Sequence, residues 1–340
     1  MSNSLLILKS LLPSNEEQRW DYLYSYFSYQ YITCDDFDHY WKITFDSPPS
    51  QECYIDPNLM KGLDWWGLSN IKKIPSAYKL RNKGIVALND SWTLYEWLRW
   101  FERTDKKNFD KLTIIHLDEH DDMMSPHLLQ KNEGLFDFFT NDIIDFTSRK
   151  VFNSIESSSI EIGSFVTLFL YFLSDRNIEI RHLGQKLHEA RDSKNYSIEV
   201  TCNKKHKLAP DYKRPVCNFI DKKNGSSNSN LTYKFFTSIE DAFDIDIDIE
   251  QPILLHIDMD YFCNRYEGCS DWKQKKNRHD PSIDEILNRI TVINKQISRL
   301  SPSIESTSIA FSPGFFPAEF WEPSYNLLTS NLLSCGLWDK

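Results

Sequence analysis

The sequence has no run of about 20 apolar residues, the length that a membrane-spanning helix needs. Its first nine residues lack the basic start and the apolar core of a signal peptide. Basic residues are also scarce, since Lys and Arg number 39 against 49 Asp and Glu, a net charge of −10. An acidic chain attracts nucleic-acid phosphates poorly. We therefore expect a cytoplasmic protein with neither a membrane nor a nucleic-acid partner.

The seven cysteines are an odd number and include no Cys-x-x-Cys pair. This pattern favours reduced thiols in a reducing compartment over a disulfide framework. With 340 residues, of which 41% are hydrophobic, the chain can fill the core of one large α/β domain or of two smaller ones.

Two mostly apolar runs end in closely spaced acids. Residues 112–117 and 253–257 are typical of strands that are buried on both faces of a parallel sheet. In a strand, residues two apart share a face, and ligands of parallel sheets bind at the carboxyl ends of the strands. The side chains expected to project together at that edge are those of Asp118, His120, Asp122, Asp258 and Asp260.

Such a cluster requires cations, because each unpaired buried carboxylate costs several kcal/mol. Oxygen ligands with few imidazoles favour manganese, magnesium or iron over structural zinc. These five ligands are more than one ion needs if it is also to bind a substrate, so we predict two ions about 3.5–4 Å apart. The alternative is that the acids cap the helices that follow them.

Asp90 is a further candidate ligand. Residues 84–88 predict a short buried strand with a polar end, and residues 92–101 predict an amphipathic helix. Followed by the strand at 112–117, they form a βαβ unit with parallel strands. Asp90 would then lie at the same sheet edge as the acidic motifs. A helix N-cap is its alternative role.

The alternation of strands and helices predicts a doubly wound, three-layer α/β/α sandwich with a mostly parallel central sheet. Residues 1–83 are rich in aromatics and are expected to pack on this domain, with residues 16–26 either strand or helix. Residues 222–230 predict a flexible loop, and 261–281 a candidate active-site lid. Further strands are expected at 40–45, 178–182, 197–201 and 308–312, and helices at 135–146, 159–173, 185–191, 239–243 and 283–300, the last opened by the capping box Ser282-x-x-Glu285.

The two acidic motifs resemble the signature motifs of the ureohydrolases, the arginase-like enzymes of the arginase/deacetylase superfamily. The text around them, at 115–122, 255–262 and 311–315, is similar to that of the peptide arginases of ribosomal-peptide natural-product pathways. The resemblance implies a single arginase-like domain over residues 1–340. It also implies a hydrolase with two manganese ions that converts arginine residues of a precursor peptide to ornithine and releases urea.

The resemblance also implies the roles of the ligands. Asp118 and Asp258 would bridge the two ions. Asp122 would hold one ion and orient the nucleophile, while His120 and Asp260 would hold the other. The family supplies one more histidine from the strand before the first motif. Here residues 89–91 read Asn-Asp-Ser, so we nominate Asp90 as the substitute.

Other residues are candidates for binding the substrate, transferring protons or orienting the metal ligands. An acid must hold the guanidinium through charge-assisted hydrogen bonds; Glu319 is the first candidate and Glu322 the second. His127 is the nearest candidate for a proton shuttle, with a surface residue as its alternative. His116 and His256 would orient the carboxylates through hydrogen bonds, or would be ordinary core histidines.

Two other functions stay open. One is a different metal-dependent amide or amidine hydrolase, such as a deacetylase. The other is a non-catalytic peptide-binding protein, which the missing histidine and the aromatic N-terminal third keep open.

Overall fold

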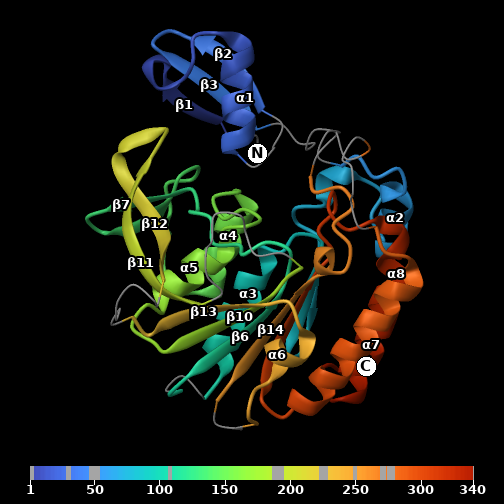
Figure 1. The fold of residues 1–340 in the computed structure, drawn as a ribbon. Helices are drawn as coiled ribbons and strands as arrows, with labels where there is room; N and C mark the ends of the chain where they lie inside the picture. Colours follow the sequence, from blue (N-terminus) through green and yellow to red (C-terminus); the bar gives the residue numbers. More distant parts are fainter. Residues whose placement is uncertain are drawn as a thin grey trace.

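The computed structural model describes residues 4–27, 32–45, 54–105, 109–185, 195–221, 229–247, 251–268, 273 and 280–339. These residues form an α/β protein with one large mixed sheet and a small separate one (Figure 1). The predicted α/β class with a mostly parallel central sheet is confirmed.

Six adjacent strands in the middle of the large sheet are mutually parallel. In spatial order they are β5 (Gly84–Ala87), β15 (Ile304–Ala310), β14 (Ile253–Asp258), β6 (Leu112–Leu117), β10 (Ile178–Leu183) and β13 (Leu231–Phe236). Strand β14 pairs directly with β6, so the two acidic motifs end side by side.

Antiparallel strands extend this parallel centre on both sides. Beyond β5 lies β4 (Tyr78–Arg81). Beyond β13 the order is β11 (Asn195–His206), β12 (Ala209–Asp221), β7 (Leu128–Lys131), β8 (Gly134–Asp137) and β9 (Ile143–Ile144).

The strands β6 and β14 are buried on both faces, with a different hydrophobic cluster on each face, which explains why they are apolar at nearly every position. Neighbouring residues alternate between the clusters: Ile114 and Leu254 belong to one, and Ile115 and Leu255 to the other. The first cluster includes α3 (Trp92–Arg103), α4 (Ser148–Glu156) and α5 (Phe165–Phe172). The second includes α2 (Leu59–Trp66), α6 (Ile239–Phe243), α7 (Ile283–Leu300) and α8 (Trp321–Ser334).

The aromatic N-terminal portion divides into two parts. Residues 4–27 and 32–45 form a small unit in which α1 (Glu16–Tyr26) covers a sheet of β1 (Ser4–Leu8), β3 (Tyr40–Phe45) and β2 (Ile32–Phe37) (Figure 1). This N-terminal unit has its own core, which Leu208 of the β11–β12 hairpin joins. The helix α2 instead belongs to the large core. The open choice at 16–26 is therefore resolved as helix.

Several local predictions are confirmed, and two need correction. The capping box at Ser282 and Glu285 is present, and α7 begins at the next residue, as predicted. The helix predicted at 135–146 is wrong, because Gly134 (φ 137°) turns the chain into the β7–β8 hairpin. The helix predicted at 159–173 begins only at Phe165, because Gly163 (φ 76°) holds the preceding residues in a turn.

Most of the predicted helix at 185–191, of the loop at 222–230 and of the second half of the lid at 261–281 lies outside the described residues. Within the described ranges, no helix is both long and apolar enough to cross a membrane.

The buried carboxylate of Glu179 supports the strand β10 far from the acidic motifs. It accepts hydrogen bonds from Lys111, Arg181 and Lys234 at 2.9, 2.7 and 3.0 Å. Burial raises its pKa, but these three cations outweigh burial and lower the pKa to about 2. Compared with the ordinary value of 4.5, this amounts to about 3 kcal/mol of stability.

We predict that Glu179→Gln lowers the free energy of unfolding by about 2–3 kcal/mol at pH 7. The difference from wild type should shrink as the pH falls from above 4.5 toward 2, because the wild-type carboxylate then becomes protonated. Urea unfolding at a series of pH values measures this. Glu199→Gln, at an exposed strand position, is the control and should change stability by less than about 0.5 kcal/mol. Equal losses in the two variants would contradict the account.

Candidate metal centre

The acidic residues of three strands meet at the carboxyl edge of the parallel sheet. Asp258 is the last residue of β14, Asp118 directly follows β6, and Asp90 lies three residues after β5. The candidate ligand atoms of these three carboxylates lie within 4.8 Å of one another. This spacing allows Asp118 and Asp258 to share an ion.

All of the predicted metal ligands fall into three overlapping groups, each with atoms within 4.8 Å. Asp118 belongs to every group, which suits a ligand shared between ions. The groups are Asp90, Asp118 and Asp258; Asp118, His120 and Asp260; and His116, Asp118, Asp122 and His256.

The two acidic motifs have the same local turn. The Asp118 carboxylate accepts a hydrogen bond from the backbone N–H of His120 at 2.7 Å, and the Asp258 carboxylate accepts one from Asp260 at 3.0 Å. An aspartate that bonds the amide two residues later ends a strand in this way. The turn aims the first and third side chains of each motif at one centre, which explains their shared spacing.

Two residues of the site have positive φ angles, Asp122 (54°) and Ser312 (42°). Such backbone conformations are costly for residues other than glycine and are concentrated at functional sites. The Ser312 hydroxyl donates to the Asp258 carboxylate at 2.5 Å, and Asp122 belongs to a metal group. The strain therefore lies at the candidate centre itself.

The carboxylates of the site are buried, and the hydrogen bonds around them leave some of their oxygens without a partner. Burial, followed by the neighbouring acids, raises the pKa of Asp118, Asp122 and Asp258 well above the usual range. Burial and the charge of Asp260 raise the pKa of Asp90 to about 7. One oxygen each of Asp90, Asp118 and Asp122 is buried without a hydrogen-bond partner. Such atoms need a ligand, and cations would fit them.

His120 is the most open member of the site. Its side chain is 42% exposed, and its Nδ1 lies 3.0 Å from an oxygen of Asp260. Burial tends to lower its pKa, but Asp260, Asp122 and Asp258 outweigh burial and raise the pKa to about 10. The ring faces that of Phe315 at 5.4 Å.

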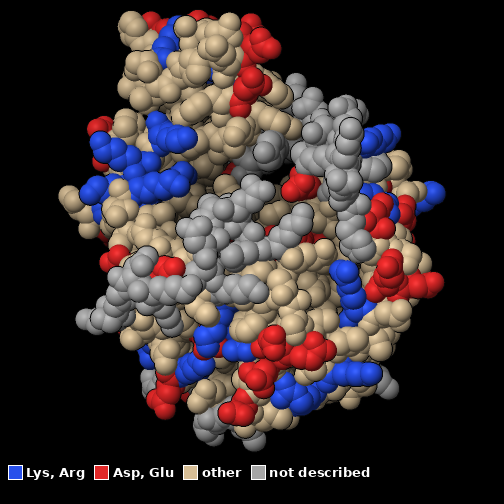
Figure 2. All heavy atoms as spheres, in the orientation of Figure 1, with Lys and Arg blue, Asp and Glu red and all other residues tan. Residues whose placement is uncertain are grey.

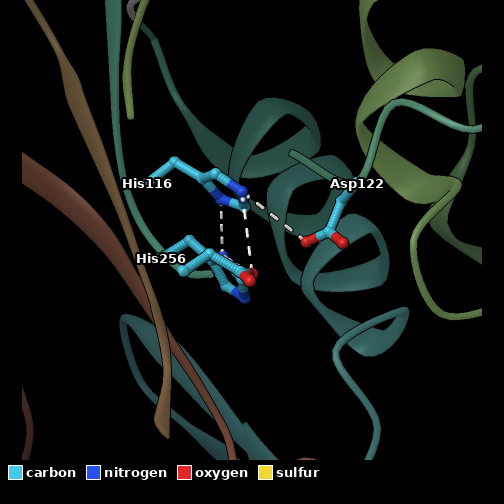
Figure 3. A group of neighbouring side chains, drawn as sticks. His116, Asp122 and His256 are labelled. Atoms are coloured by element: carbon cyan, nitrogen blue, oxygen red, sulfur yellow. Dashed lines mark hydrogen bonds and ion pairs between the residues drawn. The ribbon is translucent and has the colours of Figure 1, made fainter. Parts of the chain in front are cut away.

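His116 and His256 lie one over the other, beside Asp122 (Figure 3). Their rings stack, and their Nδ1 atoms are 2.8 Å apart, so one ring donates to the other. His116 Nε2 is 3.1 Å from the carbonyl of His120 and 3.6 Å from an oxygen of Asp122. Burial holds the pKa of both histidines well below the usual range, so they are neutral.

His182 completes a row of three buried histidines. It pairs in register with His116, which pairs with His256, across the strands β10, β6 and β14. Its Nε2 lies 2.9 Å from the backbone carbonyl of Asp118. The sequence analysis missed His182, although its position in the strand at 178–182 matches that of the other two.

His127 does not lie on the surface. It is buried, and its Nε2 is 3.1 Å from a carboxylate oxygen of Glu161. Its ring packs against those of Tyr26, the last residue of α1, and Phe27, which follows it. The alternative of a surface residue is therefore wrong. His127 links the N-terminal unit to the large sheet.

Glu319 and Glu322 do not join the metal groups. Glu319 accepts from the Arg265 guanidinium at 2.8 Å and from the Asn58 amide at 2.6 Å. Glu322 is exposed in the first turn of α8. One buried acid that was not predicted as a site residue is Glu161, two residues before Gly163, which lies beside Asp122.

No protein-family model matches this chain, and no curated protein sequence matches it at a significant level. The class that the structure defines is therefore an α/β protein with a candidate metal centre at the carboxyl edge of its sheet.

We predict that the chain binds two divalent ions and that Asp118→Asn loses both, because Asp118 belongs to every group. Asp260→Asn should lose one. Metal content after dialysis against manganese, measured by plasma mass spectrometry, gives the count. Manganese at 100 times its Kd should stabilise the wild type by about 2.7 kcal/mol for each ion bound.

Asp121→Asn is the matched control, since Asp121 lies in the same loop but in none of the groups. It should bind manganese as the wild type does. Two ions retained by Asp118→Asn would contradict the assignment of this residue.

Proposed function

We propose that the protein is a binuclear manganese hydrolase that converts arginine residues of a peptide to ornithine and urea. The observation that supports this most is the convergence of Asp118, Asp258 and their motif partners on one centre, with buried oxygens that lack partners. The resemblance of the two motifs to those of the peptide arginases supplies the reaction. The helices on both sides of the sheet support the three-layer α/β/α sandwich of that superfamily, which we propose as the finer fold.

The donor set suits manganese. It contains five carboxylates and His120, with neutral His116 and His256 beside them, whereas structural zinc sites are richer in thiolate and imidazole. Asp90 takes the place where the family has a histidine. When bound, two such ions stabilise negative charge and make a water molecule between them acidic enough to act as a nucleophile at neutral pH.

The protein side chains would then position the reactants. Asp122, held at a strained φ angle, directs an unpartnered oxygen into the centre and can accept a proton from the attacking water. His116 keeps the loop of Asp122 in place, because its Nε2 contacts the carbonyl of His120. The Ser312 hydroxyl fixes the orientation of Asp258.

Glu319 remains our candidate for holding the guanidinium of the substrate. Its carboxylate already binds one guanidinium, that of Arg265, at 2.8 Å, and its side chain is 36% exposed. The substrate would replace Arg265, which keeps a second partner in Asp280 at 2.9 Å. An exchange between two guanidinium groups costs less than exposing an unpaired carboxylate.

We predict that the protein with manganese releases urea from an arginine-containing peptide. The peptide should lose the mass of urea less one water, which mass spectrometry detects directly. Asp122→Asn should lower kcat at least about 100-fold, because it removes the proton acceptor. Turnover of free arginine but of no peptide would overturn the substrate. Release of acetate from an acetyl-lysine peptide would favour the deacetylase alternative.

We also predict that Glu319→Gln raises KM for the peptide about 10–100-fold, the loss expected for a charge-assisted hydrogen bond. Glu322→Gln, at the exposed start of α8, is the matched control and should leave KM unchanged. Steady-state kinetics with urea as the readout measures both. A KM that rises only in Glu322→Gln would transfer the role to that residue.

A further inference from the structure

The β11–β12 hairpin concentrates positive charge in a chain whose net charge is −10. Residues 201–215 contain five basic residues and one acid, Asp211. Figure 2 shows Lys and Arg side chains gathered on this face beside the N-terminal unit. We call the lysines among them, with one residue of the neighbouring strand β7, the basic hairpin surface: Lys131, Lys204, Lys205, Lys207 and Lys213. Arg214 of the same hairpin is buried.

Like charges face each other on this hairpin. Lys204 lies directly opposite Arg214, and Lys205 lies opposite Lys213 on the paired strand. Such pairs destabilise a sheet unless an anion neutralises them. Among the described residues, no carboxylate forms an ion pair with Lys204, Lys205 or Lys213. The exposed lysines are therefore available to an anionic partner.

This surface is connected to the candidate metal centre. The Arg214 guanidinium donates to the carbonyl of Ser125 at 3.2 Å and lies 3.4 Å from Nδ1 of His127. Ser125 is only three residues after Asp122, no more than about 11 Å along an extended chain. An extended peptide gains about 3.3–3.6 Å per residue, so a single peptide can contact two sites that lie this far apart along the chain of contacts.

The two sites have opposite charges. Glu319, the candidate ligand of the substrate guanidinium, attracts positive charge, while the hairpin repels it and attracts acids. A bound peptide would therefore be oriented by its own charges. Nucleic acid is a poorer fit, because the patch is small and the remainder of the chain is acidic.

We propose that the basic hairpin surface binds an acidic segment of the peptide substrate whose arginine enters the metal centre. This inference rests on the proposed function for the identity of the substrate. The hairpin would determine which arginine is modified, by holding the acids that precede or follow it.

The test uses two peptides that differ only in one segment. Each carries one arginine, and six residues away one has three aspartates where the other has three asparagines. The full-length protein with manganese should bind the acidic peptide about tenfold more tightly in fluorescence anisotropy, and KM should follow while kcat stays unchanged. This preference should weaken as salt is added.

Lys204→Glu combined with Lys213→Glu should abolish the preference. These changes turn both like-charged pairs into opposite-charged pairs, so the hairpin should keep its fold. Lys72→Glu with Lys295→Glu changes the net charge equally at exposed sites away from the hairpin and should retain the preference.

Equal affinity of the wild type for the two peptides would overturn the inference, as would an unchanged preference in the hairpin variant. An oligonucleotide of the same charge that binds as tightly would also overturn it, because the surface would then attract any polyanion. If the acidic peptide binds through the hairpin but no urea forms with either peptide, the proposed function fails while the binding surface stands.

Discussion

The repulsion among buried carboxylates is the constraint on which the rest of this structure depends. Asp90, Asp118 and Asp258 come from three strands and have atoms within 4.8 Å of one another. Burial raises the pKa of each of these groups, so the chain alone cannot keep them all ionised. We propose that divalent ions resolve this conflict and turn an electrostatic cost into a reactive site.

The fold brings these acids together by strand order. The strands β6 and β14 are distant in sequence but adjacent and parallel in the sheet, so their motifs end at one edge. Three buried histidines lie in register in the strands that end at that edge, and the Ser312 hydroxyl donates to Asp258 from the next strand connection. The antiparallel hairpin and the N-terminal unit then add a second, oppositely charged surface beside it.

Hydrophobic runs and capping residues in the sequence correctly predicted the strands and the helix start that depend on neighbouring residues alone. The apolar runs predicted the strands β6 and β14, because a strand that is covered on both faces needs apolar residues at nearly every position. The capping box predicted the start of α7. The turn at Gly134 escaped prediction, since the apolar residues after it also fit a helical period. The partners of His127 and Glu319 could not be predicted at all, because Glu161 and Arg265 reach them only through tertiary packing.

The most direct test of the central claim is anomalous diffraction from crystals grown with manganese. The account predicts two manganese peaks about 3.5–4 Å apart, with Asp118 and Asp258 contacting both. A single peak, or ions that bind without contact to Asp118, would contradict it.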